Sequence, residues 1–214
     1  MGDLSFLLRG LVLGFSIAAP VGPIGVLCIR RTLAEGRAMG FVTGMGAAAA
    51  DGLYGAIAAF GITWITAALV SQQVWIRVLG GLFLLYLGLR TFFSRPSDRA
   101  EGDRAAGAGG RGLAGAFGST FLLTVTNPMT ILSFVAVFAG LGLGGGASGP
   151  VAAALLVIGV VAGSAAWWLT LSGVVSLLRG RFDARSMQWV NRLSGAVITA
   201  FGVVSLAGLL TART

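Results

Sequence analysis

Asp51 is the residue of this sequence whose type and position most clearly suggest chemistry. It lies near the middle of an apolar run from about Ala38 to Phe60, whereas the other carboxylates fall in the termini or in the polar segments between runs. A charged side chain at the centre of a bilayer costs at least ~2.5 kcal/mol, so we expect Asp51 to face other helices. It could bind a substrate amine, carry a coupling proton or do both. The alternative is a structural hydrogen bond or an ion pair with an arginine.

Two proline-containing interruptions lie inside apolar runs. Pro20-Val21-Gly22-Pro23 interrupts the run from about Leu4 to Ile29, and Asn127-Pro128 interrupts the run from about Leu113 to Ala139. Proline removes a backbone donor and clashes with the preceding turn, so neither helix can continue unbroken. Irregular backbone at membrane depth is tolerated only against protein or a wet cavity. We therefore expect both breaks to border a substrate site, with ordinary proline kinks as the alternative.

A polar face surrounds the second interruption. Its members fall at roughly helical spacing and are Ser119, Thr120, Thr124, Asn127 and Thr130. This face is too polar for lipid. The Asn127 amide can donate and accept hydrogen bonds, so it either contacts a substrate or satisfies backbone groups that Pro128 leaves without partners.

The composition excludes several kinds of chemistry. The chain has one cysteine, Cys28, and no histidine. A structural zinc site needs about four ligands of the Cys or His type, and a Ser–His or Cys–His pair cannot form. No P-loop is present, which argues against direct use of ATP. We predict a protein that is not an enzyme and carries no metal or cofactor, with Cys28 as a small packing residue.

Hydropathy identifies an integral membrane protein of the all-α class. Of the 214 residues, 56% are hydrophobic and 10% are charged, and the mean hydropathy is +0.91. A spanning helix needs about 20 mostly apolar residues. Six runs meet this requirement: about Leu4 to Ile29, Ala38 to Phe60, Val74 to Phe93, Leu113 to Ala139, Pro150 to Leu178 and Met187 to Leu210. We expect them to form one six-helix transmembrane domain over residues 1–214.

The arginines indicate how the chain crosses the membrane. All 15 basic residues are Arg, and twelve of them lie in the first, third and fifth connections or at the run ends beside them; the first cluster is Arg30, Arg31 and Arg37. Arg9 and Arg77 are expected near the outer ends of spans. The other two connections, Gly61 to Gln73 and Gly140 to Gly149, contain no charged residue. Basic residues mark the cytoplasmic side, so we expect the Arg-rich loops inside and both termini outside. The net charge of +8 thus reflects topology, and no nucleic-acid partner is expected.

The six apolar runs fall into two groups of three. A polar, flexible linker at about 95–111 separates halves at about 1–94 and 112–214. A unit of three spans ends on the opposite side of the membrane from where it began. A second copy of that unit is therefore inverted relative to the first. Interrupted helices in corresponding positions of two inverted halves are typical of transporters. We therefore predict an inverted 3+3 repeat in which helices one and four are broken.

Small residues recur four positions apart along the first two runs. The first carries Gly10, Gly14, Ala18 and Gly22, and the second carries Gly36, Gly40, Gly44, Ala48, Gly52 and Ala56. Such ridges allow helix backbones to approach closely. The sequence leaves open whether they pack inside one chain or form a homodimer.

Residues 14–25, Gly-Phe-Ser-Ile-Ala-Ala-Pro-Val-Gly-Pro-Ile-Gly, resemble the first-helix signature of the LysE/RhtB family of amino-acid exporters. The similarity continues through residues 27–33 and the region around Asp51, and Asn127-Pro128 resembles the second conserved segment. The family's commoner Pro-Gly-Pro is lengthened here to Pro20-Val21-Gly22-Pro23, which leaves the substrate open. The resemblance implies amino-acid efflux across the bacterial cytoplasmic (inner) membrane, driven by the proton gradient.

These observations predict a secondary exporter, an antiporter of amino acids or similar solutes with protons. We expect the substrate carboxylate against amides near Gly22 and Gly25, and its amine near Asp51 and the face of Thr124 and Asn127. Protonation of Asp51 would release the amine. Two alternatives stay open: export of another small solute or a cation on the same fold, and a membrane assembly protein that transports nothing.

Overall fold

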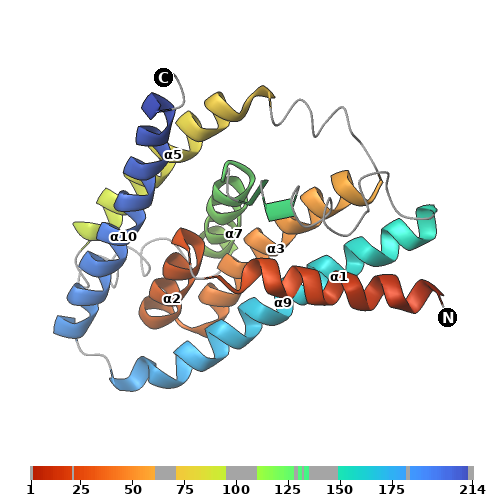
Figure 1. The fold of residues 1–214 in the computed structure, drawn as a ribbon. Coiled ribbons are helices and arrows are strands. Elements are labelled where there is room, and N and C mark those ends of the chain that lie inside the picture. Colours follow the sequence, from red (N-terminus) through yellow and green to blue (C-terminus); the bar gives the residue numbers. More distant parts are fainter. Residues whose placement is uncertain are drawn as a thin grey trace.

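All regular structure in the described part of the chain is helical (Figure 1). The computed structural model describes residues 2–20, 22–60, 71–94, 110–127, 130–131, 133–134, 149–181 and 184–211. The helices are α1 (Gly2–Ala18), α2 (Pro23–Glu35), α3 (Arg37–Ala59), α5 (Gln73–Phe92), α7 (Gly110–Val125), α9 (Pro150–Leu178), the short 3₁₀ helix η1 (Arg179–Arg181) and α10 (Ala184–Thr211). The predicted all-α class is confirmed. Most of the predicted linker at 95–111 lies outside the described residues, as do residues 61–70.

Three stretches of helix are long and apolar enough to cross a membrane. They are Val74–Phe92, Pro150–Arg181 and Arg185–Gly208. The pair Leu4–Ala18 and Pro23–Glu35 makes a fourth if it counts as one bent span. The structure therefore supports a membrane protein with three or four spans among the described residues. The six-span inverted arrangement stays a prediction.

The two other predicted spans differ from an ordinary lipid-facing helix for separate reasons. Helix α3 has 23 residues, but it is rich in Gly and Ala, and much of it is buried against other helices. Small residues contribute little hydropathy, so α3 resembles a helix packed inside the protein more than a lipid-facing span. Helix α7 has an apolar stretch, Gly112–Val125, that is too short to cross a membrane alone.

Glycines bring α1 and α9 into backbone contact. A Cβ on Gly14 would lie 2.7 Å from the carbonyl carbon of Val160, and a Cβ on Gly10 would lie 3.0 Å from the Cα of Gly159. Gly163 similarly faces the backbone of α1. Gly10 and Gly14 of the small-residue ridge thus pack inside the chain, against α9, and are not available as a dimer interface.

The packed helix pairs have defined directions. Along the α1–α9 seam the residue numbers of both helices rise together, so this pair is parallel. The same holds for α3 and α7, where Gly46 meets Phe117 and Tyr54 meets Val125. Helices α3 and α9 are antiparallel, and so are α5 and α10, whose seam runs from Gly81 against Leu206 to positions near Phe92 and Gly195.

Helix α2 lies between two groups of helices (Figure 1). It contacts α3 and α9 on one side and α10 on the other. Its Leu27 shares a buried cluster with Leu84 and Leu87 of α5, Leu123 of α7 and Ile198 of α10. A single residue, Gly36 with φ +103°, joins α2 to α3. Because this φ favours glycine, the sharp turn between the two helices requires that residue.

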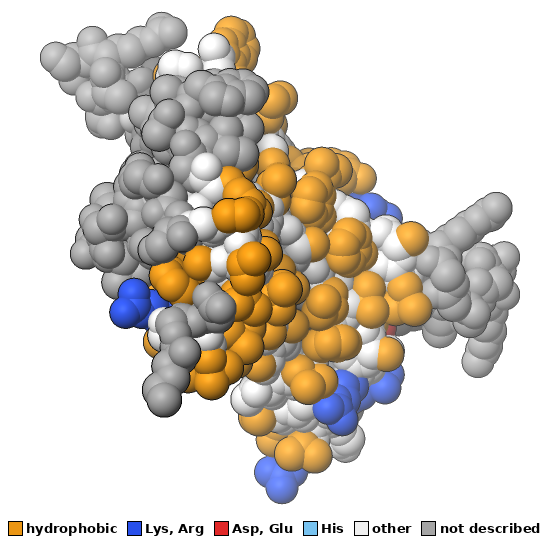
Figure 2. All heavy atoms as spheres, turned by 90° about the vertical axis from the view of Figure 1, so that its right-hand side faces the viewer, with side chains coloured by type: hydrophobic (Ala, Val, Ile, Leu, Met, Phe, Trp, Pro, Cys, Tyr) orange, Lys and Arg blue, Asp and Glu red, His pale blue; other side chains and the backbone are white. Residues whose placement is uncertain are grey.

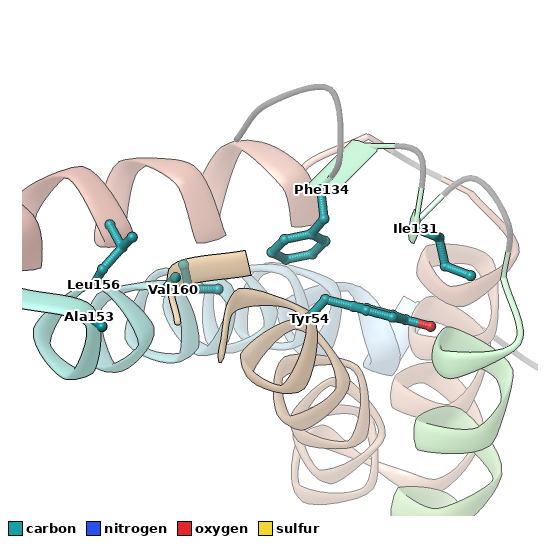
Figure 3. Packing of buried hydrophobic residues seen from close by; sticks show 7 residues of the cluster. Tyr54, Ile131, Phe134, Ala153, Leu156 and Val160 are labelled. Carbon is teal, nitrogen blue, oxygen red and sulfur yellow. The ribbon is translucent and has the colours of Figure 1, made fainter. Parts of the chain in front are cut away.

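Many large apolar side chains of the described residues are exposed, as on a lipid-facing surface. Figure 2 shows hydrophobic side chains gathered over the middle of one face, with arginines mostly around its edges. A second buried cluster joins α3, α9 and the segment after α7, and Figure 3 shows Tyr54, Phe134 and Val160 within it. The ring centroids of Tyr54 and Phe134 lie 5.8 Å apart. This cluster anchors the interrupted fourth run to the core of the molecule.

Candidate functional site

A cavity of about 700 Å³ lies where helices α1, α2, α3, α5, α7, α9 and α10 meet. Seven of the eight residues predicted for the substrate site line it: Pro20, Gly22, Pro23, Gly25, Asp51, Thr124 and Asn127. The eighth, Pro128, lies outside the described residues. These residues come from three separate parts of the sequence, and the fold brings them around one space. A volume of this size is typical of pockets for small molecules.

One wall of the cavity is the break between α1 and α2. The two helices meet at an angle of 81°. The amide of Ala19 still donates to the carbonyl of Phe15 at 3.0 Å, so α1 ends in regular hydrogen bonding. Gly22 then caps α2 without a side-chain hydrogen bond, and Pro23 occupies its first turn. Proline is preferred there because its missing N–H would have no partner inside the helix.

The first turn of α2 presents backbone donors to the cavity. The amides of Ile24 and Gly25 precede the first intrahelical bond, which runs from Val26 N–H to the Gly22 carbonyl at 3.0 Å. No acidic side chain lies in this turn, and both residues line the cavity. The partial positive charge of a helix N-terminus therefore borders the space.

Gly22 is not required for close packing of the two helix ends. A Cβ at this position would meet no heavy atom within 4 Å. Its φ of −108° and ψ of −164° lie in the extended region that other residues adopt. Gly22 borders open cavity, so a larger residue there would change the cavity rather than the fold.

Asp51 is buried on α3 and is held by α9. Its side chain is 4% exposed. The Ser164 hydroxyl donates to Asp51 Oδ2 at 2.7 Å, and the indole N–H of Trp168 donates to Ser164 Oγ at 3.2 Å. Trp168 also lines the cavity. This chain of donors orients the carboxyl group of Asp51 at the cavity wall.

The second break follows α7. The amide of Asn127 bonds to the Thr124 carbonyl at 3.1 Å, which tightens the last turn. The Asn127 carbonyl then accepts from the amides of Thr130 and Ile131 at 3.1 and 3.3 Å. The Tyr54 hydroxyl donates to the Val125 carbonyl at 2.5 Å. Because an interrupted helix leaves terminal carbonyls without intrahelical partners, Tyr54 stabilises this break from the neighbouring helix.

The polar face of α7 serves two environments rather than one. Toward the start of the helix, the guanidinium of Arg31 donates to Ser119 Oγ at 2.9 Å and to Thr120 Oγ1 at 3.2 Å. Toward its end, Thr124 and Asn127 line the cavity. Two of the five members of the predicted polar face therefore bind an arginine, and the other three, Thr124, Asn127 and Thr130, line the cavity.

Arg30 and Arg31 are not loop residues, contrary to the sequence prediction. Both lie inside α2, and Arg30 is 2% exposed. Arg30 Nε donates to Asn191 Oδ1 at 2.8 Å, and its Nη2 donates to Ser94 Oγ at 3.2 Å. Hydropathy alone cannot separate a cytoplasmic loop from a helix whose arginines are hydrogen-bonded inside the protein. The predicted topology therefore depends on the remaining arginines.

Three functional candidates were missing from the sequence prediction: Ser164, Tyr54 and the α5–α10 wall of the cavity. Ser164 carries the hydrogen bond to Asp51, and its signal was only a polar residue in the middle of a long apolar run. Tyr54 follows Asp51 by three positions, which places both on one face of α3.

The described residues contain no group of three or more His, Cys, Asp or Glu side chains that could hold a metal ion.

Comparison with known proteins places the chain among translocators. The model of the family "LysE type translocator" matches residues 15–208. The chain is 27% identical over 202 residues to "Putative amino acid efflux protein YcgF" of Bacillus subtilis (strain 168), covering 93% of this chain and 94% of that protein. It is 28% identical over 181 residues to "Uncharacterized membrane protein YahN" of Escherichia coli (strain K12), covering 82% and 77%.

No solved structure matches the chain significantly. The family model nevertheless covers both helix breaks, Asp51 and the whole cavity lining. The protein therefore belongs to the LysE type translocators, a family of membrane transporters rather than enzymes.

Proposed function

We propose that this chain is a secondary exporter that carries amino acids out of the cytoplasm in exchange for protons. The observation that carries the proposal is that the N-terminus of α2 and the carboxyl group of Asp51 border the same cavity. A zwitterion needs a donor set for its carboxylate and an acceptor set for its ammonium group. The similarity to "Putative amino acid efflux protein YcgF" of Bacillus subtilis supports the same substrate class.

The carboxylate of the substrate binds at the first turn of α2. The amides of Ile24 and Gly25 supply backbone donors, and the helix dipole adds the equivalent of about half a positive charge. Pro23 supplies no donor, and Gly22 carries no side chain that would compete with the substrate for these amides. The neutral, uncapped helix end favours an anion.

The ammonium group binds at Asp51 and the end of α7. The Thr124 hydroxyl donates to the Thr120 carbonyl, and the Thr126 hydroxyl donates to the Leu122 carbonyl, both at 2.8 Å. With their hydrogens used in this way, the two oxygens can only accept from the cavity. Together with Asp51 they form an acceptor set, which suits an ammonium group and disfavours a carboxylate.

Asp51 couples the substrate to protons. An ionised carboxylate holds the ammonium group by charge, and a protonated one has lost that attraction. Proton uptake at Asp51 from the outer side then releases the amino acid, and deprotonation toward the cytoplasm resets the site. The Ser164 hydroxyl keeps the Asp51 side chain in place through both states.

Alternating access follows from an inverted 3+3 repeat. If α1 corresponds to α7, α3 to α9 and α5 to α10, a two-fold axis in the membrane plane carries the α1–α9 pair onto α7–α3. The parallel direction of both pairs and the antiparallel direction of α3–α9 and α5–α10 support this relation. We further propose that both termini face outward from the cytoplasmic membrane and that the Arg-rich connections lie inside.

The test is amino-acid counterflow in proteoliposomes with wild type and Asp51→Asn. The variant keeps the size of the side chain but not its charge, so we expect an affinity at least tenfold weaker (about 1.4 kcal/mol) and loss of the pH dependence. Glu35→Gln is the matched control, because it makes the same chemical change at a carboxylate outside the cavity lining. Unchanged affinity and pH dependence in Asp51→Asn would refute the role of Asp51.

A further inference from the structure

The cavity has a second wall whose chemistry differs from that of the wall around Asp51. It is formed by Leu84 of α5, Leu123 of α7, and Phe201 and Val204 of α10. None of these side chains can form a hydrogen bond. The polar groups of the cavity lie mainly in the interior of α3, at the end of α7 and beyond it, and at the break before α2, with Ser205 as a polar residue of α10. The space thus has a mainly polar side and a mainly apolar side.

We propose that this apolar wall is the side-chain pocket, and that the substrates are neutral amino acids with aliphatic or aromatic side chains. This inference rests on the proposed function, because it assumes that the carboxylate and ammonium groups bind at α2 and Asp51. With both ends of the zwitterion held there, the remaining space of the cavity belongs to the substrate side chain. Each methylene group placed against such a wall strengthens binding by about fourfold.

The charges of the cavity disfavour a basic substrate. Among the lining residues that the structure describes, Asp51 is the one ionisable side chain, and it is used by the α-ammonium group. A lysine side chain would bring a second ammonium group against Leu84 and Phe201 without a counter-charge. Removing an unpaired charge from water is far more costly than burying an apolar group.

An acidic substrate is disfavoured for a related reason. The backbone donors of the cavity described here lie at the first turn of α2, where the α-carboxylate binds, and no arginine lines the cavity among the described residues. A second carboxylate would therefore find no positively charged side chain among the described lining residues. A neutral apolar side chain avoids both costs.

The exposed fraction of each wall residue decides where a substitution can test the pocket without disturbing the core. Leu84 is 7% and Leu123 is 2% exposed, and both belong to the buried cluster with Leu27 and Ile198. Val204 is 69% exposed, so it forms the rim of the pocket. A larger residue at Val204 would narrow the pocket without overpacking the core.

The experiment measures thermal shift and counterflow with L-leucine, L-methionine, L-alanine and L-lysine. For wild type we expect leucine, which has three more side-chain carbons than alanine, to bind about 60-fold more tightly than alanine, and methionine to bind similarly to leucine. We expect lysine to bind at least tenfold more weakly than leucine. In Val204→Phe we expect the preference for leucine over alanine to fall severalfold. Val203→Phe is the matched control, since the neighbouring valine is 52% exposed and does not line the cavity.

The outcomes separate this inference from the proposed function. Lysine binding as tight as leucine, or an unchanged leucine preference in Val204→Phe with normal folding, would overturn the apolar pocket while export of amino acids stands. If Val204→Phe does not fold, the lysine and alanine comparison in wild type decides alone. Absence of binding and exchange for all four amino acids would overturn the proposed function and this inference with it.

Discussion

Replacing Gly14 by alanine is expected to separate α1 from α9 and to destabilise the protein. The new Cβ would lie 2.7 Å from the carbonyl carbon of Val160 and 2.8 Å from its Cα. Carbon atoms in ordinary contact are ~3.5–4.0 Å apart, so the helices must separate by at least about 0.8 Å. The carbonyl oxygen of Val160 obstructs the Cβ as well, and all three atoms belong to the backbone of α9, so no side-chain rotation can relieve the overlap.

The cost follows from the loss of contact along the seam. A gap of ~0.5–1 Å forfeits a quarter to a half of the attraction between packed atoms, and overpacking of well-packed interiors costs roughly 1–3 kcal/mol. For a chain of this length, ~2 kcal/mol corresponds to roughly 4–8 °C in Tm. Since α1 ends four residues later at Ala18, a displaced helix would also shift the break that borders the cavity.

The assay is thermal unfolding of the purified protein in nanodiscs, with Gly118→Ala as the matched control. Gly118 also lies inside a helix, α7, but a Cβ there would meet no heavy atom within 4 Å. Alanine is better than glycine in a helix by roughly 0.5–1 kcal/mol, so the control should unfold at an unchanged or slightly higher temperature. A Gly14→Ala protein as stable as Gly118→Ala would refute the close α1–α9 seam.

Two further changes test the helix break and the buried arginine. In Gly22→Ala we expect an unchanged Tm, because the new Cβ enters open space. We also expect a severalfold higher KM for the amino acid in counterflow, and a KM equal to that of wild type would place the substrate elsewhere. In Asn191→Ala the buried Arg30 loses an acceptor at 2.8 Å, so we expect a loss of ~1.5–3 kcal/mol in unfolding free energy. Leu193→Ala, at an exposed position of the same helix, should leave the unfolding free energy nearly unchanged. Equal stability of the two variants would contradict a stabilising hydrogen bond between Arg30 and Asn191.

Several features of the site were predictable because they depend on residues close together in the sequence. Proline and glycine within four positions break a helix whatever surrounds them, so the junction at residues 19–22 could be predicted. The isolation of Asp51 in an apolar run indicated a buried carboxyl group, and its exposure of 4% agrees. The spacing of Thr124 and Asn127 likewise indicated a face turned toward protein.

The tertiary structure alone decided which groups meet. The Ser164 hydroxyl reaches Asp51 across 113 positions, and Arg30 reaches Asn191 across 161. Pairs of this kind depend on how whole helices pack, and hydropathy or local spacing does not encode them. The sequence alone therefore assigned Arg30 and Arg31 to a loop, whereas both lie in α2, where Arg30 is buried and Arg31 is partly buried.

The sequence by itself determined a helical membrane chain, a break at each of two proline-containing segments and one carboxylate in the apolar interior. The tertiary structure determined that these features share one cavity, and that α5 and α10 supply its apolar side. The physical reason is that helix formation and breakage are local properties of the backbone. A cavity, in contrast, is the space that remains after distant surfaces have packed as closely as their side chains allow.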